Sequence, residues 1–222
     1  GAHKRRKLGV PGEEKSGVMH GTDFLREVGL AQRGAAPLDS MPDVAGKKVA
    51  VVGGGNVALD AARTAWRMGA SEVHVIYRRT RADMPAYAEE VHAAYEEGVQ
   101  FHFLANPVEA LGDAAVTGMV VQRQRLGEFD AGGRRRPVPI DGDTFVLPVD
   151  VIIPAIGQTT DTSWMQKAGI QSTRSSTFVV GDAFQTSRGG VFACGDAVSG
   201  PATVVEAVAQ GNQVSVAVDH WL

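Results

Sequence analysis

The segment that most restricts the fold runs from residue 47 to residue 77. It begins with the continuous apolar run Val49–Val52, which is typical of a strand buried on both faces of a parallel sheet. Three glycines follow, and then apolar residues recur at helical spacing over 56–68. A second apolar strand, Val73–Tyr77, completes a strand–turn–helix–strand unit. We therefore expect an α/β fold built on a parallel sheet.

The glycine run fits the GxGxxA pattern of a dinucleotide-binding turn. In this pattern the first glycine permits a tight turn, the second lets backbone N–H groups approach a pyrophosphate, and the alanine lets the helix pack on the strand. The start of the helix adds unpaired N–H groups and partial positive charge. A glycine-rich connection without a ligand is the alternative. The residues predicted to bind the dinucleotide here are Gly53, Gly54, Gly55, Asn56, Val57 and Ala58.

The end of the second strand indicates which dinucleotide binds. An NAD site usually has Asp or Glu there to bind the ribose 2′-hydroxyl, whereas this chain continues Tyr77-Arg78-Arg79-Thr80-Arg81. A carboxylate would repel a 2′-phosphate, and guanidinium groups can bind one through two hydrogen bonds. We predict NADP(H), with Arg78 and Arg79 as the phosphate contacts. A solvated loop of arginines is the alternative.

The same patterns predict the other elements. The first 45 residues contain one helix, from Thr22 to about Gly29, in a stretch rich in Gly and Pro. Beyond residue 85 we expect one helix over 85–97 and another over 201–221. Strands are predicted over 99–103, 149–156 and 190–194, and a polar-faced antiparallel meander over 116–126, 134–140 and 144–148, with turns at 130–133 and 141–143.

Composition narrows the class of protein. The 222 residues are 44% hydrophobic and 21% charged with net charge −3, so nothing suggests a nucleic-acid partner. No apolar run approaches the roughly 20 residues of a membrane span. The lone cysteine, Cys194, excludes an internal disulfide; on a buried strand it is expected to be a small core side chain. The six histidines lack metal-ligand spacing, so we expect no metal site, and we expect a cytoplasmic location.

A second motif lies near the C-terminus. Gly190–Ala197 resembles the C-terminal FAD motif of flavoproteins with two dinucleotide-binding folds, and Ala155–Gln158 resembles the segment at which their pyridine-nucleotide insert rejoins the flavin domain. More closely, the chain is similar to the glutamate synthase small-subunit family over Lys7–Glu13, Gly53–Asp60, Tyr77–Ala86 and Gly190–Gly211. That family includes related NADPH oxidoreductase subunits.

The resemblance implies a Rossmann-like NADP(H)-binding domain inserted into a partial FAD-binding domain. Residues 1–45 would be a remnant or linker of the FAD-binding domain, 46–157 the NADP(H)-binding domain, and 158–222 the C-terminal part of the FAD-binding domain. Hydride would pass from NADPH to FAD, and electrons would continue through iron–sulfur clusters to a larger partner subunit. The implied flavin contacts are Gly157, Gly195, Asp196, Ala202 and Thr203.

One part of the family pattern has no counterpart in this sequence. The family begins with an FAD-phosphate turn preceded by a cysteine-rich cluster segment, and neither is present here. We therefore expect the chain alone to be inactive and its activity to need that N-terminal segment. The alternative is a stand-alone dinucleotide-binding or sensing module without catalysis, which would have no use for the second flavin motif.

Overall fold

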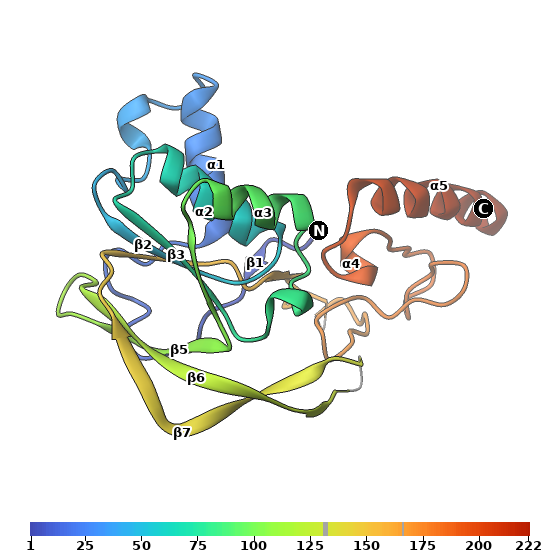
Figure 1. The fold of residues 1–222 in the computed structure, drawn as a ribbon. Helices are drawn as coiled ribbons and strands as arrows, with labels where there is room; N and C mark the ends of the chain where they lie inside the picture. The colour runs from blue at the N-terminus through green and yellow to red at the C-terminus, as the bar shows by residue number, and fades with distance from the viewer. Residues whose placement is uncertain (131–132, 166) are drawn as a thin grey trace. The chain divides into compact units, whose positions relative to one another are not determined.

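The computed structural model describes residues 1–130, 133–165 and 167–222, which form two compact units (Figure 1). The larger unit comprises Lys7–Ile156. The smaller unit combines Gly1–Arg6 with Gly157–Leu222. The larger unit is therefore inserted into the sequence of the smaller one.

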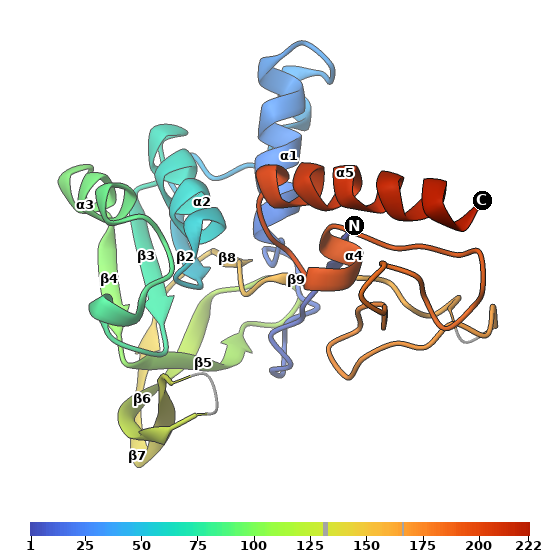
Figure 2. The same cartoon turned by 90° about the vertical axis from the view of Figure 1, so that its right-hand side faces the viewer.

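The larger unit has three layers, centred on a four-stranded parallel sheet (Figures 1 and 2). The strand order is β4-β3-β2-β8, and every neighbouring pair is parallel. Helices cover one face of this sheet and an antiparallel meander covers the other. The strands are β2 (Lys48–Val52), β3 (Glu72–Tyr77), β4 (Gln100–Phe103) and β8 (Val151–Pro154), and the helical segments are α1 (Gly21–Gln32), η1 (Leu38–Ser40), α2 (Asn56–Arg67), η2 (Arg81–Asp83) and α3 (Ala88–Glu96).

The alternation of side chains along β2 explains the layers. Val49 and Val51 belong to the hydrophobic cluster on the helical side, whereas Ala50 and Val52 belong to the cluster on the meander side. All four side chains are buried. The prediction of a strand buried on both faces is confirmed, and so is the α/β fold class.

The first 45 residues do not form the separate remnant that the sequence predicted. From Lys7 onward they belong to the larger unit, because α1 packs on α2 and contributes to the core. Phe24 is fully buried, and Val28 and Val44 are almost fully buried. The compact unit therefore begins at Lys7 rather than at residue 46, because apolar residues of this stretch complete the helical layer.

The meander differs from its prediction in two ways. It consists of β5 (Ala105–Leu111), β6 (Gly118–Phe129) and β7 (Arg135–Leu147), so β5 was missed and two predicted strands are one. The predicted turn at 141–143 is instead part of a bulge: Gln122 pairs with Thr144 and Gln124 with Pro139, which leaves several β7 residues opposite one. The side-chain amide of Gln122 donates to two carbonyls of this bulge. The centre of the other predicted turn, 131–132, lies outside the described residues.

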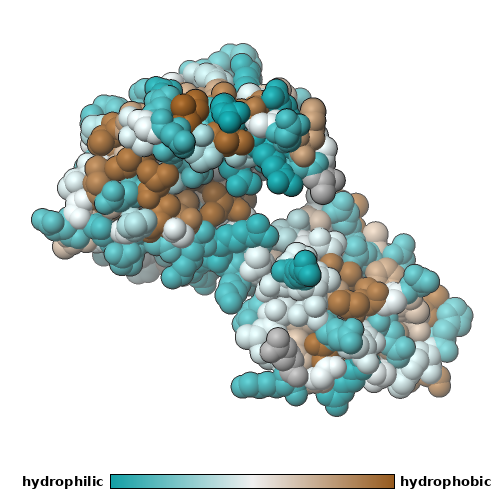
Figure 3. All heavy atoms as spheres, turned by 90° about the horizontal axis from the view of Figure 1, so that it is seen from below, coloured by the Kyte–Doolittle hydropathy of each residue, from teal (hydrophilic) through white to brown (hydrophobic). Residues whose placement is uncertain are grey.

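The outer face of the meander is not uniformly polar. Figure 3 views the molecule from the side of the meander and shows apolar residues gathered on the larger unit. The exposed large apolar side chains of β5–β7 are Val108, Phe129, Ile140 and Val146. The bulge in β7 interrupts the alternation on which the polar-face prediction depended.

The predicted helix over 85–97 begins later than expected. Residues 84–87 are extended because two backbone N–H groups bind the glycine-rich turn region: Ala86 donates to the Gly54 carbonyl and Tyr87 to the Asn56 side-chain oxygen. The helix can start only after these contacts, at Ala88.

The smaller unit contains β1 (Lys4–Arg5), β9 (Gln158–Thr159), α4 (Asp196–Ser199) and α5 (Val204–Trp221). β1 and β9 pair antiparallel, so the chain's first residues are joined to the segment after Gly157. The predicted strand over 190–194 is wrong, since the described residues pair it with a neighbour only at a single bridge, Gln185–Phe192. Cys194 is half-buried rather than a core side chain.

Candidate functional site

The glycine-rich turn lies between β2 and α2, at the carboxyl edge of the parallel sheet. Gly53 has φ 148°, and a Cβ built on it would lie 2.4 Å from the Ala155 carbonyl oxygen. A Cβ on Gly54 would lie 2.5 Å from the Tyr77 ring. Ala58 is fully buried and lies directly beneath Gly53. The protein's own packing therefore requires small residues at these three positions.

Gly55 is different, because the protein itself leaves room for a side chain there. Its φ of −92° and ψ of 175° are open to any residue, and the nearest atom to a built Cβ is Pro85 Cγ at 3.9 Å. Gly55 is the N-cap of α2, so the first N–H groups of the helix begin beside this open space. The space and the unpaired donors fit the pyrophosphate of a dinucleotide.

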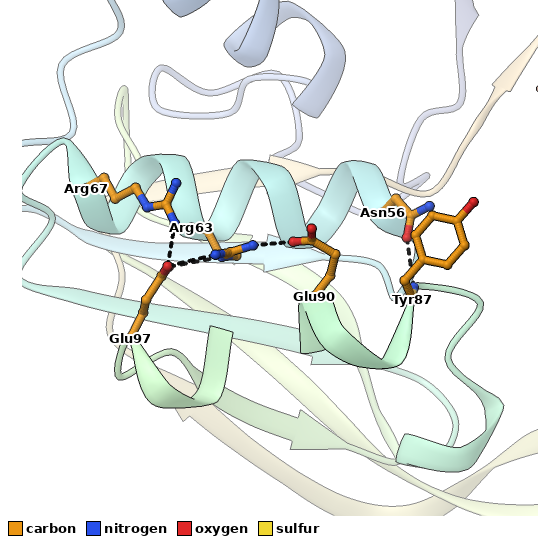
Figure 4. Close-up of polar contacts among 6 residues, drawn as sticks. All are labelled: Asn56, Arg63, Arg67, Tyr87, Glu90 and Glu97. Atoms are coloured by element: carbon orange, nitrogen blue, oxygen red, sulfur yellow. Dashed lines mark hydrogen bonds and ion pairs between the residues drawn. The ribbon is translucent and has the colours of Figure 1, made fainter. Parts of the chain in front are cut away.

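Asn56 and Val57 form the first turn of α2. The side-chain oxygen of Asn56 accepts the backbone N–H of Tyr87 at 3.0 Å, as Figure 4 shows, and thereby connects the start of α2 to the start of α3. The Asn56 side chain thus positions the site, while the helix N–H groups remain the candidate donors. Val57 is 38% exposed.

The loop after β3 is held at several points. The Tyr77 hydroxyl donates to the Asp83 carbonyl at 2.7 Å, and the Thr80 hydroxyl and backbone N–H both donate to the Asp83 carboxylate. These hydrogen bonds keep the pKa of Asp83 below its usual value, and burial raises the pKa of Tyr77. The backbone of the loop is therefore fixed by hydrogen bonds within the protein.

The two predicted phosphate contacts separate in the structure. Arg78 is exposed, whereas Arg79 is 5% exposed. The Arg79 guanidinium donates from Nη2 to Asp130 Oδ2 at 3.1 Å and from Nε to the Arg135 carbonyl at 3.0 Å. Arg79 therefore faces the meander, and only Arg78 of this pair is presented to solvent.

A third arginine in the same loop was not among the predicted contacts. Arg81 is exposed, and its guanidinium carbon lies 5.0 Å from the centre of the Tyr95 ring, so α3 supports it from below. The Arg-Arg-x-Arg spacing was the available signal. Arg78 and Arg81 are the exposed cations of this loop.

The flavin-type segment lies in the smaller unit, around the start of α5. The Gly195 N–H donates to Gln210 Oε1 at 2.7 Å, and Asp196 Oδ1 accepts the Ala202 N–H at 3.3 Å. Thr203 caps α5 in a reciprocal pair with Glu206, so its hydroxyl already has a partner. These contacts bring together four of the five predicted flavin residues.

Gly157 lies apart from these contacts within the same unit. It has φ 102°, and its carbonyl accepts the Arg6 N–H at 3.3 Å. Gln210, on α5, was missed by the sequence analysis because nothing in a helix interior marks a side chain that bonds back to a turn. The described residues contain no group of three or more His, Cys, Asp or Glu arranged to hold a metal ion.

Comparison with known proteins identifies the family of this chain. The model of the pyridine nucleotide-disulphide oxidoreductase family matches residues 1–211. The chain belongs to this family. The expected cofactors, NADPH and FAD, are those of this family of oxidoreductases. No helix among the described residues is long and apolar enough to cross a bilayer.

Relatives within the family confirm the resemblance to the glutamate synthase small subunit. The NADP(+)-dependent formate dehydrogenase subunit beta of Moorella thermoacetica is 48% identical across the whole chain, which covers 31% of that relative. The glutamate synthase [NADPH] small chain of Escherichia coli (strain K12) is 34% identical, again across the whole chain, which covers 49% of it. The chain thus spans about a third to a half of the length of these oxidoreductase subunits.

Solved structures show the same fold. FprA of Mycobacterium tuberculosis in complex with NADPH has a TM-score of 0.75 at 20% identity, covering all of this chain and 61% of that one. The thioredoxin reductase of T. acidophilum has a TM-score of 0.72 at 22% identity, covering 97% of this chain and 62% of that one. At these identities the likeness establishes the fold alone.

Proposed function

We propose that this member of the pyridine nucleotide-disulphide oxidoreductase family is the NADP(H)- and FAD-binding part of a larger NADPH-dependent oxidoreductase. The observation that carries the proposal is the open space at Gly55, at the start of α2, on a turn where the neighbouring positions are filled by the protein. When bound, the two cofactors would supply hydride transfer from NADPH to FAD. The chain's own residues bind and orient them.

In the larger unit, the N–H groups at the start of α2 bind the pyrophosphate over Gly55. Arg78 binds the 2′-phosphate of the adenosine ribose, and Arg81 adds positive charge at the same edge. Because hydrogen bonds already fix the loop, little conformational entropy is lost when the nucleotide binds.

In the smaller unit, Asp196 is the residue best placed to bind a hydroxyl group of FAD. Its Oδ1 accepts the Ala202 N–H, and within the described residues its Oδ2 accepts no hydrogen bond. Ala202 and Thr203 precede α5, whose N-terminal N–H groups would stabilise negative charge on a reduced flavin. Gly157 and Gly195 supply backbone at positive φ beside this segment.

The rest of the oxidoreductase is also part of the proposal. The relatives are about two to three times longer than this chain, so we propose that a further N-terminal segment completes the FAD site and carries iron–sulfur clusters. Electrons would leave through these clusters to a larger subunit, in the cytoplasm. The chain alone would bind NADPH without turning it over.

The test compares two glycine variants. Gly55→Ala should leave the unfolding midpoint in urea nearly unchanged, because its backbone is unstrained and its Cβ meets nothing closer than 3.9 Å. It should weaken NADPH binding by about tenfold or more, because the methyl group occupies the phosphate's space (about 1.4 kcal/mol per factor of ten). Calorimetric titration measures the affinity.

Gly53→Ala is the matched control. Its Cβ would collide with the Ala155 carbonyl at φ 148°, so it should lower stability by about 1–3 kcal/mol whether or not a ligand is present. If Gly55→Ala binds NADPH as tightly as the unchanged chain, the open space is not the phosphate site and the proposal fails. Equal binding of NADPH and NADH by the unchanged chain would leave a dinucleotide-binding module that does not select NADP(H).

A further inference from the structure

Arg79 is buried, although it lies in the loop that we propose binds the 2′-phosphate. Its neighbour Arg78 is exposed, but the guanidinium of Arg79 is buried between the end of β3 and the β6–β7 hairpin. Its hydrogen bonds reach both arms of that hairpin: Asp130 follows β6, and Arg135 begins β7. Arg79 therefore connects the nucleotide loop to an element more than fifty residues away in sequence.

The backbone of Arg79 is connected to the meander as well. The Arg79 carbonyl accepts the N–H of Leu104 at 3.0 Å, and the Leu104 carbonyl accepts the N–H of Gln124 at 2.7 Å. Leu104, between β4 and β5, has φ 51°, a conformation that a leucine adopts rarely. Side chain and backbone together fix residue 79 from one side of the loop.

The residues on either side of Arg78 and Arg79 in the sequence are fixed by further contacts. The Tyr77 ring packs against Gly54, its hydroxyl binds the Asp83 carbonyl, and Thr80 binds the Asp83 carboxylate. Arg78 lies between these two sets of contacts and is itself exposed. The direction in which Arg78 leaves the backbone therefore depends on residue 79 being held in place.

We propose that Arg79 is a positioning residue, and that the β6–β7 hairpin acts through it to set the selectivity of the site for a 2′-phosphorylated nucleotide. This inference rests on the proposed NADP(H) site. A buried guanidinium that reaches one carboxylate and one carbonyl costs desolvation free energy, so it adds geometric precision more than stability. Arg79 itself makes no contact with the 2′-phosphate. It fixes the backbone beside Arg78, and the Arg78 side chain binds the phosphate.

The experiment is a double-mutant cycle on nucleotide selectivity. The quantity measured is the ratio of the Kd for NADH to the Kd for NADPH, by calorimetric titration of the purified chain. Arg78→Ala and Arg79→Met should each lower this ratio by about tenfold (about 1.4 kcal/mol). The variant with both changes should lower it no further than Arg78→Ala alone, because Arg79 acts only through Arg78.

Asp130→Ala supplies a second route to the same test without altering the loop that carries Arg78 and Arg79. It removes the carboxylate that binds Arg79, so it should lower the ratio in the unchanged chain and have no effect in the Arg78→Ala background. This variant carries the test if Arg79→Met does not fold. Urea unfolding of every variant shows whether that variant is folded under the conditions of the titration.

Four results would overturn the inference. Additive losses in the double variant would mean that Arg79 contacts the phosphate itself. Equal weakening of NADH and NADPH binding would mean a general structural role. An unchanged ratio in Arg79→Met and Asp130→Ala, with a lowered ratio in Arg78→Ala, would reject the positioning role and keep the NADP(H) site. An unchanged ratio in Arg78→Ala would reject both.

Discussion

Two histidines, the buried His74 and the half-buried His102, form a pair between the parallel sheet and the meander. His74 Nδ1 lies 3.1 Å from His102 Nε2, and His74 Nε2 lies 3.2 Å from a Glu72 oxygen. Burial lowers the pKa of both, and the nearby cations Lys48 and Arg123 act in the same direction, while Glu72 partly opposes this at His74. Both side chains are thus expected to be neutral in the folded protein.

This pair predicts a loss of stability in mild acid. A histidine whose pKa is lowered by folding stabilises the protein fully above its unfolded value of about 6.5, and that contribution is lost as the pH falls through its folded pKa. The free energy of unfolding should therefore fall below about pH 6.5, with a slope of at most about 1.4 kcal/mol per pH unit for each histidine. Urea unfolding at pH 5.0–8.0 measures it.

The matched control replaces both histidines with glutamine, which keeps hydrogen-bonding groups but does not titrate. The double variant should lose most of the dependence of the free energy of unfolding on pH between pH 5.5 and 7. Carboxylates with lowered pKa, such as Asp83, act only at lower pH. An identical pH profile in the double variant would show that the pair is not the source.

At the scale of single residues, the sequence predicted the position of the glycine turn but not which side chains bond to one another. Gly53, Gly55 and Ala58 could be placed between a strand and a helix because a glycine-rich turn is a local feature, and their contacts with a dinucleotide stay a prediction. Arg79 could not, because its partners Asp130 and Arg135 come from a hairpin whose register no local pattern sets. Cys194 was misplaced because, within the described residues, its predicted strand pairs with a neighbour only at the Gln185–Phe192 bridge.

Among the elements, α2 and α3 are joined by a charged network (Figure 4). Arg63 on α2 bonds to Glu90 and to Glu97, which begin and follow α3, and Arg67 also bonds to Glu97. The Arg63 side chain is 18% exposed, whereas that of Arg67 is 62% exposed. The network raises the pKa of Arg63 and lowers that of Glu97, so both stay charged.

Arg63→Met should lower the free energy of unfolding by about 1–2 kcal/mol, because it leaves two carboxylates without their shared cation in a half-buried site. Arg67→Met is the control, with an expected cost under about 0.5 kcal/mol, since its ion pair is exposed to solvent. Urea unfolding gives both values. Equal losses of unfolding free energy in the two variants would contradict the claim that Arg63, because it is more buried, contributes more to stability than Arg67.

The ends of an element could be predicted where the hydrophobic periodicity of the sequence sets them. They could not be predicted where contacts with distant residues set them. α2 follows its predicted range because buried Ala and Leu residues recur at helical spacing. α3 starts late because Ala86 and Tyr87 bond to the region of the glycine turn. β7 continues through a Gly-Asp pair that reads as a turn, since Gln122 satisfies the carbonyls of the bulge.

At the scale of the molecule, both hydrophobic clusters lie within Lys7–Ile156. The sequence placed the first 45 residues outside this unit because their Gly and Pro content resembles a linker. It could not show that Phe24, Val28 and Val44 fill the helical layer, since that packing joins residues far apart in the chain. The expectation of an inserted domain came from the family resemblance, and the compact unit Lys7–Ile156 lies within the sequence of the smaller unit.

The central claim is that the turn at Gly53–Ala58 and the loop at Arg78 form a site for NADP(H). The most direct measurement is a calorimetric titration of the unchanged chain with NADPH and, separately, with NADH. The account predicts one site per chain and a Kd for NADPH at least about tenfold lower than that for NADH, the contribution of the 2′-phosphate contact. Equal affinities, or no binding of NADPH, would contradict it.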